Sequence, residues 1–197
     1  ALYHDIGKMN NPAYFTENQN NFNPHSRLSY EQSASIVINH VKDGLKLADK
    51  YNLPQIIKDF ITTHHGKGKT KYFFISYKNQ NPDMPVDESL FTYPGPNPFT
   101  LEQAILMMAD SVEAASRSLN EYTEESISTL VDKIIDAQMA EGFFQDCPIT
   151  FHDINLAKEV FKEKLRTIYH TRISYPELKK KPEETAQETA QAGSTSK

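Results

Sequence analysis

Six residues of the types that bind metal ions stand out in this 197-residue sequence: His4, Asp5, His40, His64, His65 and Asp110. Neutral imidazoles and carboxylates that face one core from several helices are how helical bundles build metal sites. Mixed histidine and carboxylate ligation suits Fe, Mn, Zn or Co. Two ions roughly 3.5–4 Å apart that share a carboxylate can activate a hydroxide for phosphodiester hydrolysis.

Asp110 lies in a part of the sequence where a charged side chain is unexpected. It follows the run Ala-Ile-Leu-Met-Met-Ala at 104–109, which is apolar on every side of a helix and is therefore expected to be buried. An ionised carboxylate in such a place costs several kcal/mol unless it is paired or bound to a cation. A single histidine on an apolar face is usually a core residue, and a single buried aspartate usually forms an ion pair. The six residues taken together favour a shared site, so we expect them to converge in one pocket.

Three other histidines receive ordinary explanations. The pair His152-Asp153 lies in the first turn of a helix that opens at Thr150, where Asp153 occupies the third position of a capping box. We interpret this pair as structural. His25 and His170 are expected to be a turn or surface residue and the end of a helix.

Hydrophobic periodicity predicts an all-α bundle of five to seven helices. Capping residues and apolar spacing place helices at about 29–51, 54–65, 100–119, 123–142 and 150–169. The aromatic-rich segment 71–78 fits a helix or a strand, and the proline-rich segment 79–99 is expected to be a loop. Residues 1–178 are assigned to one domain, and the polar segment 179–197 is expected to be a disordered tail.

Composition narrows the function classes. The net charge of −5 argues against a protein that grips duplex nucleic acid, because such domains are usually basic. The single cysteine, Cys147, excludes an intrachain disulfide framework and fits a reducing compartment. No apolar run approaches the ~18 residues of a membrane-spanning helix.

Short motifs along the chain resemble those of the HD phosphohydrolase superfamily. More closely, they resemble the cytoplasmic HD domain of the PgpH-type, seven-transmembrane-receptor HD proteins, over residues 1 to about 177. The motifs are His-Asp-Ile-Gly-Lys at 4–8, Asn-Pro-His at 23–25, His-Val-Lys-Asp-Gly at 40–44, His-His-Gly at 64–66, Tyr-Pro-Gly-Pro at 93–96, Ala-Asp-Ser-Val-Glu-Ala-Ala at 109–115 and Ile-Tyr-His-Thr-Arg-Ile-Ser-Tyr-Pro-Glu at 168–177.

This resemblance implies a cyclic-di-AMP phosphodiesterase with a di-iron or di-manganese centre and the linear dinucleotide pApA as product. Asp5 would bridge the two ions, His4 and Asp110 would hold one, and the other would be held by His40, His64 and His65. The family has a further histidine on a helix upstream of the His-Asp pair, which this sequence does not contain. We therefore expect the ion at His4 and Asp110 to be the less well retained. The parent protein is expected to be tethered to the inner face of the cell membrane.

Four residues are candidates for contacts with the substrate. Lys8 lies one helical turn after His4 and is expected to act with Asp5 in catalysis and to reach a phosphate oxygen. Ser111, Arg117 and Tyr93 are further candidates for substrate contacts, although Arg117 could simply pair with Glu113. Aromatic residues at 72–77 offer surfaces for stacking adenines or for core packing, and lysines 67, 69 and 71 form a positive strip beside His65.

Alternative functions remain open at this point. Cyclic di-GMP is disfavoured, because the related HD-GYP family carries Gly-Tyr-Pro shortly after its His-His pair and this chain has Gly-Lys-Gly-Lys-Thr at 66–70. A phosphohydrolase for another nucleotide, or a module that binds a nucleotide without cleaving it, would also fit the residues.

Overall fold

The structure, a computed structural model, describes residues 1–19 and 22–170, and six α-helices lie within them. The expected tail at 179–197 lies outside the described residues. Short 3-10 helices occupy the N-terminal segment and the proline-rich loop, where η5 spans Glu88–Phe91. The α-helices are α1 (Tyr30–Lys50), α2 (Gln55–Thr63), α3 (Lys71–Gln80), α4 (Leu101–Ser116), α5 (Glu124–Ala140) and α6 (Phe151–His170).

Local sequence signals explain where the helices begin. The Ser29 hydroxyl accepts a hydrogen bond from the backbone N–H of Gln32, whose side chain returns to the backbone of Ser29, so the predicted capping box at α1 is confirmed. Thr100 caps α4 and Thr123 caps α5 in the same way through their hydroxyls. The ambiguous segment 71–78 is helical and forms most of α3. The all-α prediction is therefore confirmed for the part of the chain that is described.

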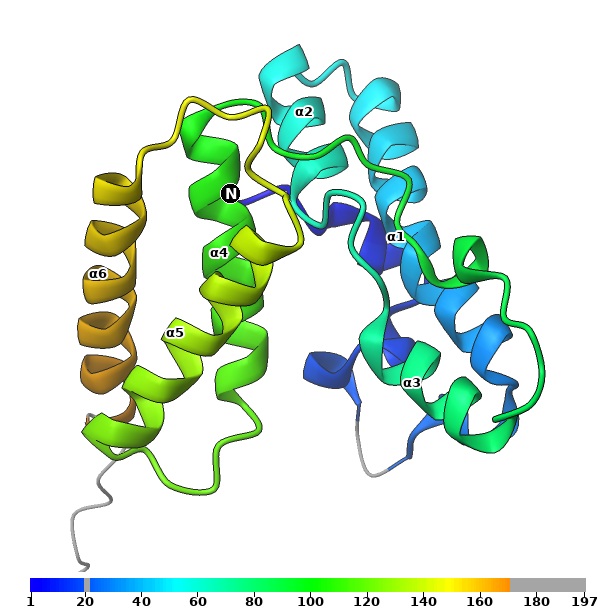
Figure 1. Cartoon of the computed structure of the whole chain (residues 1–197). Coiled ribbons are helices and arrows are strands. Elements are labelled where there is room, and N and C mark those ends of the chain that lie inside the picture. The colour runs from blue at the N-terminus through cyan, green and yellow to red at the C-terminus, as the bar shows by residue number, and fades with distance from the viewer. Residues whose placement is uncertain (20–21, 171–197) are drawn as a thin grey trace, which may run out of the picture.

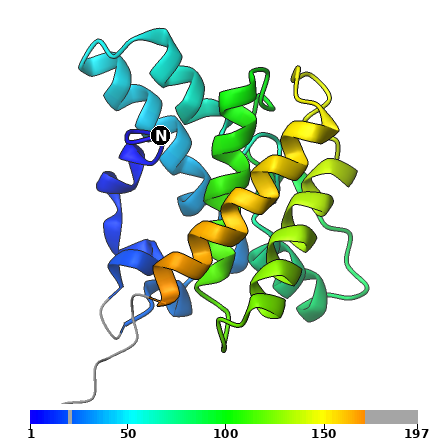
Figure 2. The ribbon, with the colours of Figure 1, turned by 90° about the vertical axis from the view of Figure 1, so that its left-hand side faces the viewer.

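The helices form two groups with separate hydrophobic cores. In Figure 1, α4, α5 and α6 lie on one side of the molecule and α1, α2 and α3 on the other. Apolar side chains of α4–α6 make one core, and α1 packs with Phe91 and Tyr93 in the second. Figure 2 shows α6 crossing over α4. The candidate ligands come from both groups, so the space between α1, α2 and α4 is where they can meet.

Two glycines allow the chain to approach closely at this junction. The segment η1 (Ile6–Asn10) packs against α1, and a Cβ on Gly7 would lie 1.8 Å from the carbonyl oxygen of His40. Glycine is therefore required for the N-terminal segment to reach α1. Gly66 has φ +53° and turns the chain just after α2, where a Cβ would lie 2.7 Å from the Asn97 side chain.

No helix in the described ranges is both long enough and apolar enough to cross a bilayer.

Candidate metal centre

The six predicted ligands converge on one place although they span more than a hundred positions in the sequence. His4 and Asp5 immediately precede η1, His40 lies in α1, His64 and His65 follow α2, and Asp110 lies in α4. Their potential ligand atoms form two sets, each with all its atoms within 4.8 Å of one another. We call Asp5, His40, His64 and His65 the four-donor group, and His4, Asp5 and Asp110 the three-donor group.

Asp5 belongs to both groups because its two oxygens point in different directions. Oδ1 lies 3.3 Å from Nε2 of His40 and 3.5 Å from Nε2 of His64. Oδ2 lies 3.3 Å from Nε2 of His4 and 2.8 Å from Nζ of Lys8. Oδ1 is buried and accepts no hydrogen bond. A buried carboxylate oxygen that is left without a partner among imidazole nitrogens is suited to a cation.

Neighbouring cationic groups keep the Asp5 carboxylate ionised. Burial opposes ionisation, but the neighbouring His4 and Lys8 help to hold the pKa of Asp5 far below its usual range. An ionised carboxylate is an acceptor only, so Asp5 cannot satisfy Oδ1 by donating a proton.

The imidazoles of His40 and His64 are oriented by backbone carbonyls. Nδ1 of His40 donates to the carbonyl of Val37, and Nδ1 of His64 donates to that of Ile61 at 2.8 Å. The Nε2 atoms of these two rings then face each other 3.1 Å apart. Burial, the largest cause, lowers the pKa of His64, and the two facing Nε2 atoms meet beside Oδ1 of Asp5. Carbonyl-oriented imidazoles of this kind are typical of metal ligands.

His4 differs from His64 in the direction of its pKa shift. Burial opposes its protonation, but the hydrogen bonds with Asp110 and Asp5 raise the pKa of His4 to about 10. Its Nε2 lies 3.4 Å from Oδ1 of Asp110, and Nδ1 bonds to the carbonyl of Ala1. The three-donor group therefore holds a proton at neutral pH in the metal-free chain.

The His65 ring is held by Tyr93. The two rings stack at 4.3 Å between centroids with an interplanar angle of 25°, and Tyr93 also meets His40 edge to face. Tyr93 is itself fixed because its backbone N–H donates to the carbonyl of Gly68 at 2.8 Å. Its side chain lines the cavity, but it is buried and one ring face is covered by His65. Tyr93 therefore packs against two candidate ligand histidines at the wall of the cavity, where it was expected to contact the substrate.

The other expected substrate contacts divide into two kinds. Lys8 and Arg117 line the same cavity as the donor groups, which agrees with their predicted position. Ser111 is not brought to the site: its hydroxyl accepts a hydrogen bond from Nε2 of Gln138 in α5 at 2.8 Å. Ser111 follows Asp110 directly, and each step along an α-helix rotates the side chain by ~100° around the axis. This rotation turns Ser111 away from the cavity.

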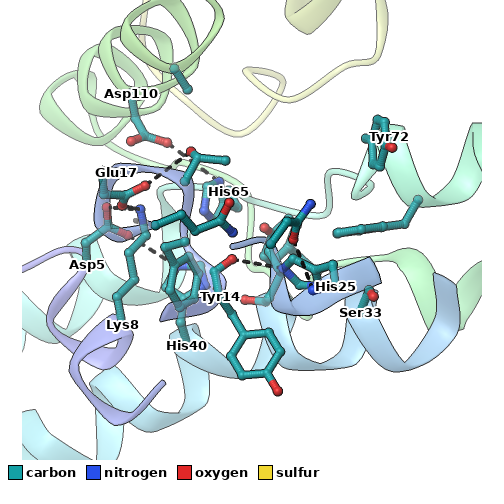
Figure 3. A pocket seen from close by; sticks show the side chains of 18 of the residues that line it. Asp5, Lys8, Tyr14, Glu17, His25, Ser33, His40, His65, Tyr72 and Asp110 are labelled. Atoms are coloured by element: carbon teal, nitrogen blue, oxygen red, sulfur yellow. Dashed lines mark hydrogen bonds and ion pairs between the residues drawn. The ribbon is translucent and has the colours of Figure 1, made fainter. Parts of the chain in front are cut away.

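A cavity of about 1200 Å³ extends from the donor groups along α1 and α3. Asp5, Lys8, Glu17 and Asp110 lie at one end in Figure 3, and His25, Ser33 and Tyr72 at the other. At that far end Nε2 of His25 donates to the carbonyl of Tyr14 at 2.9 Å, and the His25 ring lies 5.1 Å from that of Phe73. His25 lies in a 3-10 turn, in agreement with the turn or surface position expected for it. The sequence did not predict that it lines the cavity.

The residues set aside as structural behave as expected. The Asp153 carboxylate accepts from the backbone N–H and the hydroxyl of Thr150, so its capping role is confirmed.

The positive strip beside His65 differs from the expectation. Lys69 and Lys71 pair with Glu88 and Glu141 and do not line the cavity.

Glu17 also lines the cavity, although the sequence did not predict it. Sequence periodicity cannot reveal it, because it lies in the three-residue 3-10 helix η3 (Thr16–Asn18).

Known proteins with similar sequences include two that cover most of this chain. It is 44% identical over 180 residues to the cyclic-di-AMP phosphodiesterase PgpH of Listeria monocytogenes and 41% identical over 182 residues to that of Bacillus subtilis. These alignments cover 91% and 92% of the chain but 25% of each relative. The chain thus spans about a quarter of the length of the curated relatives it matches.

Solved structures agree with the sequence comparison. The crystal structure of the L. monocytogenes PgpH HD domain superposes with a TM-score of 0.80 at 41% identity, covering 86% of this chain and 79% of that one. The same domain in complex with cyclic-di-AMP gives a TM-score of 0.81 at 43% identity, covering 85% and 78%. The family model of the HD domain matches residues 1–115. The chain therefore belongs to the HD-domain family and is an HD domain of the PgpH type.

Proposed function

We propose that this chain is a metal-dependent phosphodiesterase that hydrolyses cyclic di-AMP to linear pApA. Water would add across one P–O3′ bond, leaving a 5′-phosphate and a free 3′-hydroxyl. The observation that carries this proposal is the position of Asp5 between two donor groups, one oxygen directed at each. The names of the L. monocytogenes and B. subtilis relatives support the choice of substrate.

The residues present fit two divalent ions. His40, His64, His65 and Asp5 would hold one, and His4, Asp110 and Asp5 the other, with Fe or Mn favoured by the family resemblance. Ions bound in such pairs polarise the phosphate and lower the pKa of the attacking water. The unpartnered Oδ1 of Asp5 and the facing Nε2 atoms of His40 and His64 are the two features that a cation would satisfy.

The other residues of the cavity would bind and orient the substrate. Lys8, held 2.8 Å from Oδ2 of Asp5, orients this carboxylate and presents an ammonium group to a phosphate. Arg117 offers a second cation from the end of α4. At the far end of the cavity, Tyr72 is mostly exposed beside Phe73, and these rings offer faces on which a base can stack.

Turnover assays on the purified chain test the proposal. The protein is prepared anaerobically, loaded with Fe(II) or Mn(II), and incubated separately with cyclic di-AMP, cyclic di-GMP and a mixture of dNTPs. We expect pApA from cyclic di-AMP and little product from the others. Binding of cyclic di-AMP without cleavage would instead identify a sensory module, and preferential cleavage of a dNTP would identify another phosphohydrolase. His152→Ala, remote from the donor groups, serves as the control variant.

A membrane-tethered parent protein is a separate proposal that rests on the family resemblance. We propose that segments outside this chain anchor the full-length protein so that this domain faces the cytoplasm. Fractionation of cells that express the full-length protein tests it. Recovery in the membrane fraction is expected, and recovery in the soluble fraction would contradict it.

A further inference from the structure

The Glu17 carboxylate lies between two cations that come from distant parts of the chain. Its Oε1 is 2.7 Å from Nζ of Lys8, and its Oε2 is 3.4 Å from Nη1 of Arg117. Lys8 belongs to η1, whereas Arg117 follows the last residue of α4. All three side chains line the cavity that contains the donor groups.

This arrangement is an anion site that the chain's own carboxylate fills. Lys8 contacts Asp5 and Glu17 at once, so the site directly adjoins the donor groups. A phosphodiester carries one negative charge and accepts hydrogen bonds through its free oxygens, as a carboxylate does. Ammonium and guanidinium groups that converge on one carboxylate are equally suited to one phosphate.

A cyclic dinucleotide has two phosphodiester groups, and only one can react at the donor groups at a time. We propose that Lys8 and Arg117 form the subsite for the second, non-reacting phosphate, and that Glu17 occupies this subsite until the substrate displaces it. This inference rests on the proposed function, because it names the part of the substrate that the same cavity holds. Glu17 is then a residue that weakens binding and restricts it to ligands able to supply a replacement anion.

Displacement requires little rearrangement. The Glu17 side chain is 31% exposed, so it can rotate toward solvent while the preceding Phe15 stays buried and holds the segment in place. Arg117 keeps a partner throughout, since its Nε and Nη2 donate to the two oxygens of Glu113 at 3.0 and 2.7 Å. Each cation therefore remains fixed when Glu17 leaves, Lys8 by Asp5 and Arg117 by Glu113.

Two substrates of different size separate a subsite from a structural contact. Metal-loaded wild type, Glu17→Gln and Arg117→Gln are assayed with cyclic di-AMP and with bis(p-nitrophenyl) phosphate, which carries a single phosphodiester. We expect Glu17→Gln to lower KM for cyclic di-AMP about fivefold and Arg117→Gln to raise it about tenfold. Neither variant should change KM for the small diester by more than about twofold. The double variant should lose the gain of Glu17→Gln, since the cation that it frees is absent.

Glu88→Gln is the matched control. Glu88 also lies in a 3-10 helix and pairs with a lysine, Lys69, but it does not line the cavity. It should leave both values of KM unchanged. An increase of KM for cyclic di-AMP in Glu17→Gln, or equal changes for both substrates together with a lower Tm, would show that Glu17 only fastens the N-terminal segment and would overturn the proposal.

Calorimetric binding separates this inference from the proposed function. If the wild type binds cyclic di-AMP but cleaves neither substrate, the proposed function fails. The ratio of Kd between wild type and Glu17→Gln then decides the subsite: tighter binding by the variant supports it, and equal or weaker binding overturns it. If neither protein binds cyclic di-AMP, both ideas fail.

Discussion

The four-donor and three-donor groups share Asp5 but differ in how firmly the fold holds them. His40 and His64 are almost completely buried, and backbone carbonyls of their own helices orient both rings. In the three-donor group, the His4 and Asp110 side chains are 20% and 18% exposed. His4 precedes every helix in the sequence, whereas Asp110 belongs to α4, in the group of helices α4–α6. One ion would therefore meet two enclosed imidazoles, with His65 23% exposed beside them, and the other a set assembled from the N-terminal segment and α4.

Protonation sharpens this difference. Burial lowers the pKa of His64, whereas Asp110 and Asp5 raise that of His4 to about 10 against the effect of burial. In the first group the neutral His64 ring is ready to accept a cation, while His4 of the second group must first release a proton. We infer that the two ions bind with different affinities and in a fixed order.

Replacing the shared ligand should have the largest effect. Asp5→Asn keeps the size of the side chain but removes the charge that both groups share. We expect loss of one or both ions and a decrease of kcat for cyclic di-AMP of about 10³-fold or more, comparable to the loss of a principal catalytic group. Metal analysis and turnover are measured together. Two retained ions with normal turnover would break the assignment of Asp5 as a bridge.

Removing one histidine from each group should separate them. His64→Ala is expected to abolish binding of the tighter ion and nearly all turnover, whereas His4→Ala should lose only the weaker ion. Metal content per chain after extensive dialysis distinguishes the two results, with His152→Ala as the control. Since His64 is fully buried, His64→Gln is tested beside it to keep the volume filled. Equal metal loss in the two groups would remove the distinction on which the order of binding depends.

Tyr93 offers a smaller change within the four-donor group. Its ring stacks on His65. Within the described residues, its hydroxyl forms no hydrogen bond with a candidate metal ligand. Tyr93→Phe should preserve metal binding, and Tyr93→Leu should weaken the tighter ion by about tenfold, as for other residues that orient metal ligands. Competition with a chelator measures the affinity. A similar loss in both variants would assign the effect to the hydroxyl instead of the stacked ring.

A change of pH separates the two groups without any substitution. Below the raised pKa of His4 the imidazole is protonated, so affinity at the three-donor group should fall by about tenfold for each unit that pH drops from 8.5 to 7. The four-donor group should change little over this interval because His64 is already neutral. Metal titrations at both pH values, with proton release followed in weak buffer, measure this. Identical pH dependence for the two ions would contradict it.

Residue type and helical spacing were enough to predict the all-α fold and the convergence of the six candidate ligands. The helices that carry His40, His64 and Asp110 have clear apolar faces, and these faces decide which side chains meet in the core. Ser111 shows the limit of this reasoning, because adjacency to Asp110 in sequence turns its hydroxyl toward Gln138.

Glu17 and His25 show a second limit. Both lie in short 3-10 turns, which lack the repeating pattern of a long helix, and their neighbours come from remote parts of the chain. The Glu17 partner Arg117 is a hundred positions away, so only the folded structure reveals the pair. The convergence of the candidate ligands could be predicted because their residue types were informative, whereas these cavity residues depend on tertiary contacts alone.

Electron paramagnetic resonance of the manganese-loaded protein tests the central claim most directly. Two Mn(II) ions bridged by Asp5 should be magnetically coupled, so a fully loaded sample is predicted to hold two ions per chain and to show the spectrum of an exchange-coupled pair. At one equivalent, with the four-donor group filled first, the spectrum should be that of an isolated ion. One ion per chain at saturation, or two ions without coupling, would contradict the account of a shared carboxylate between two metal sites.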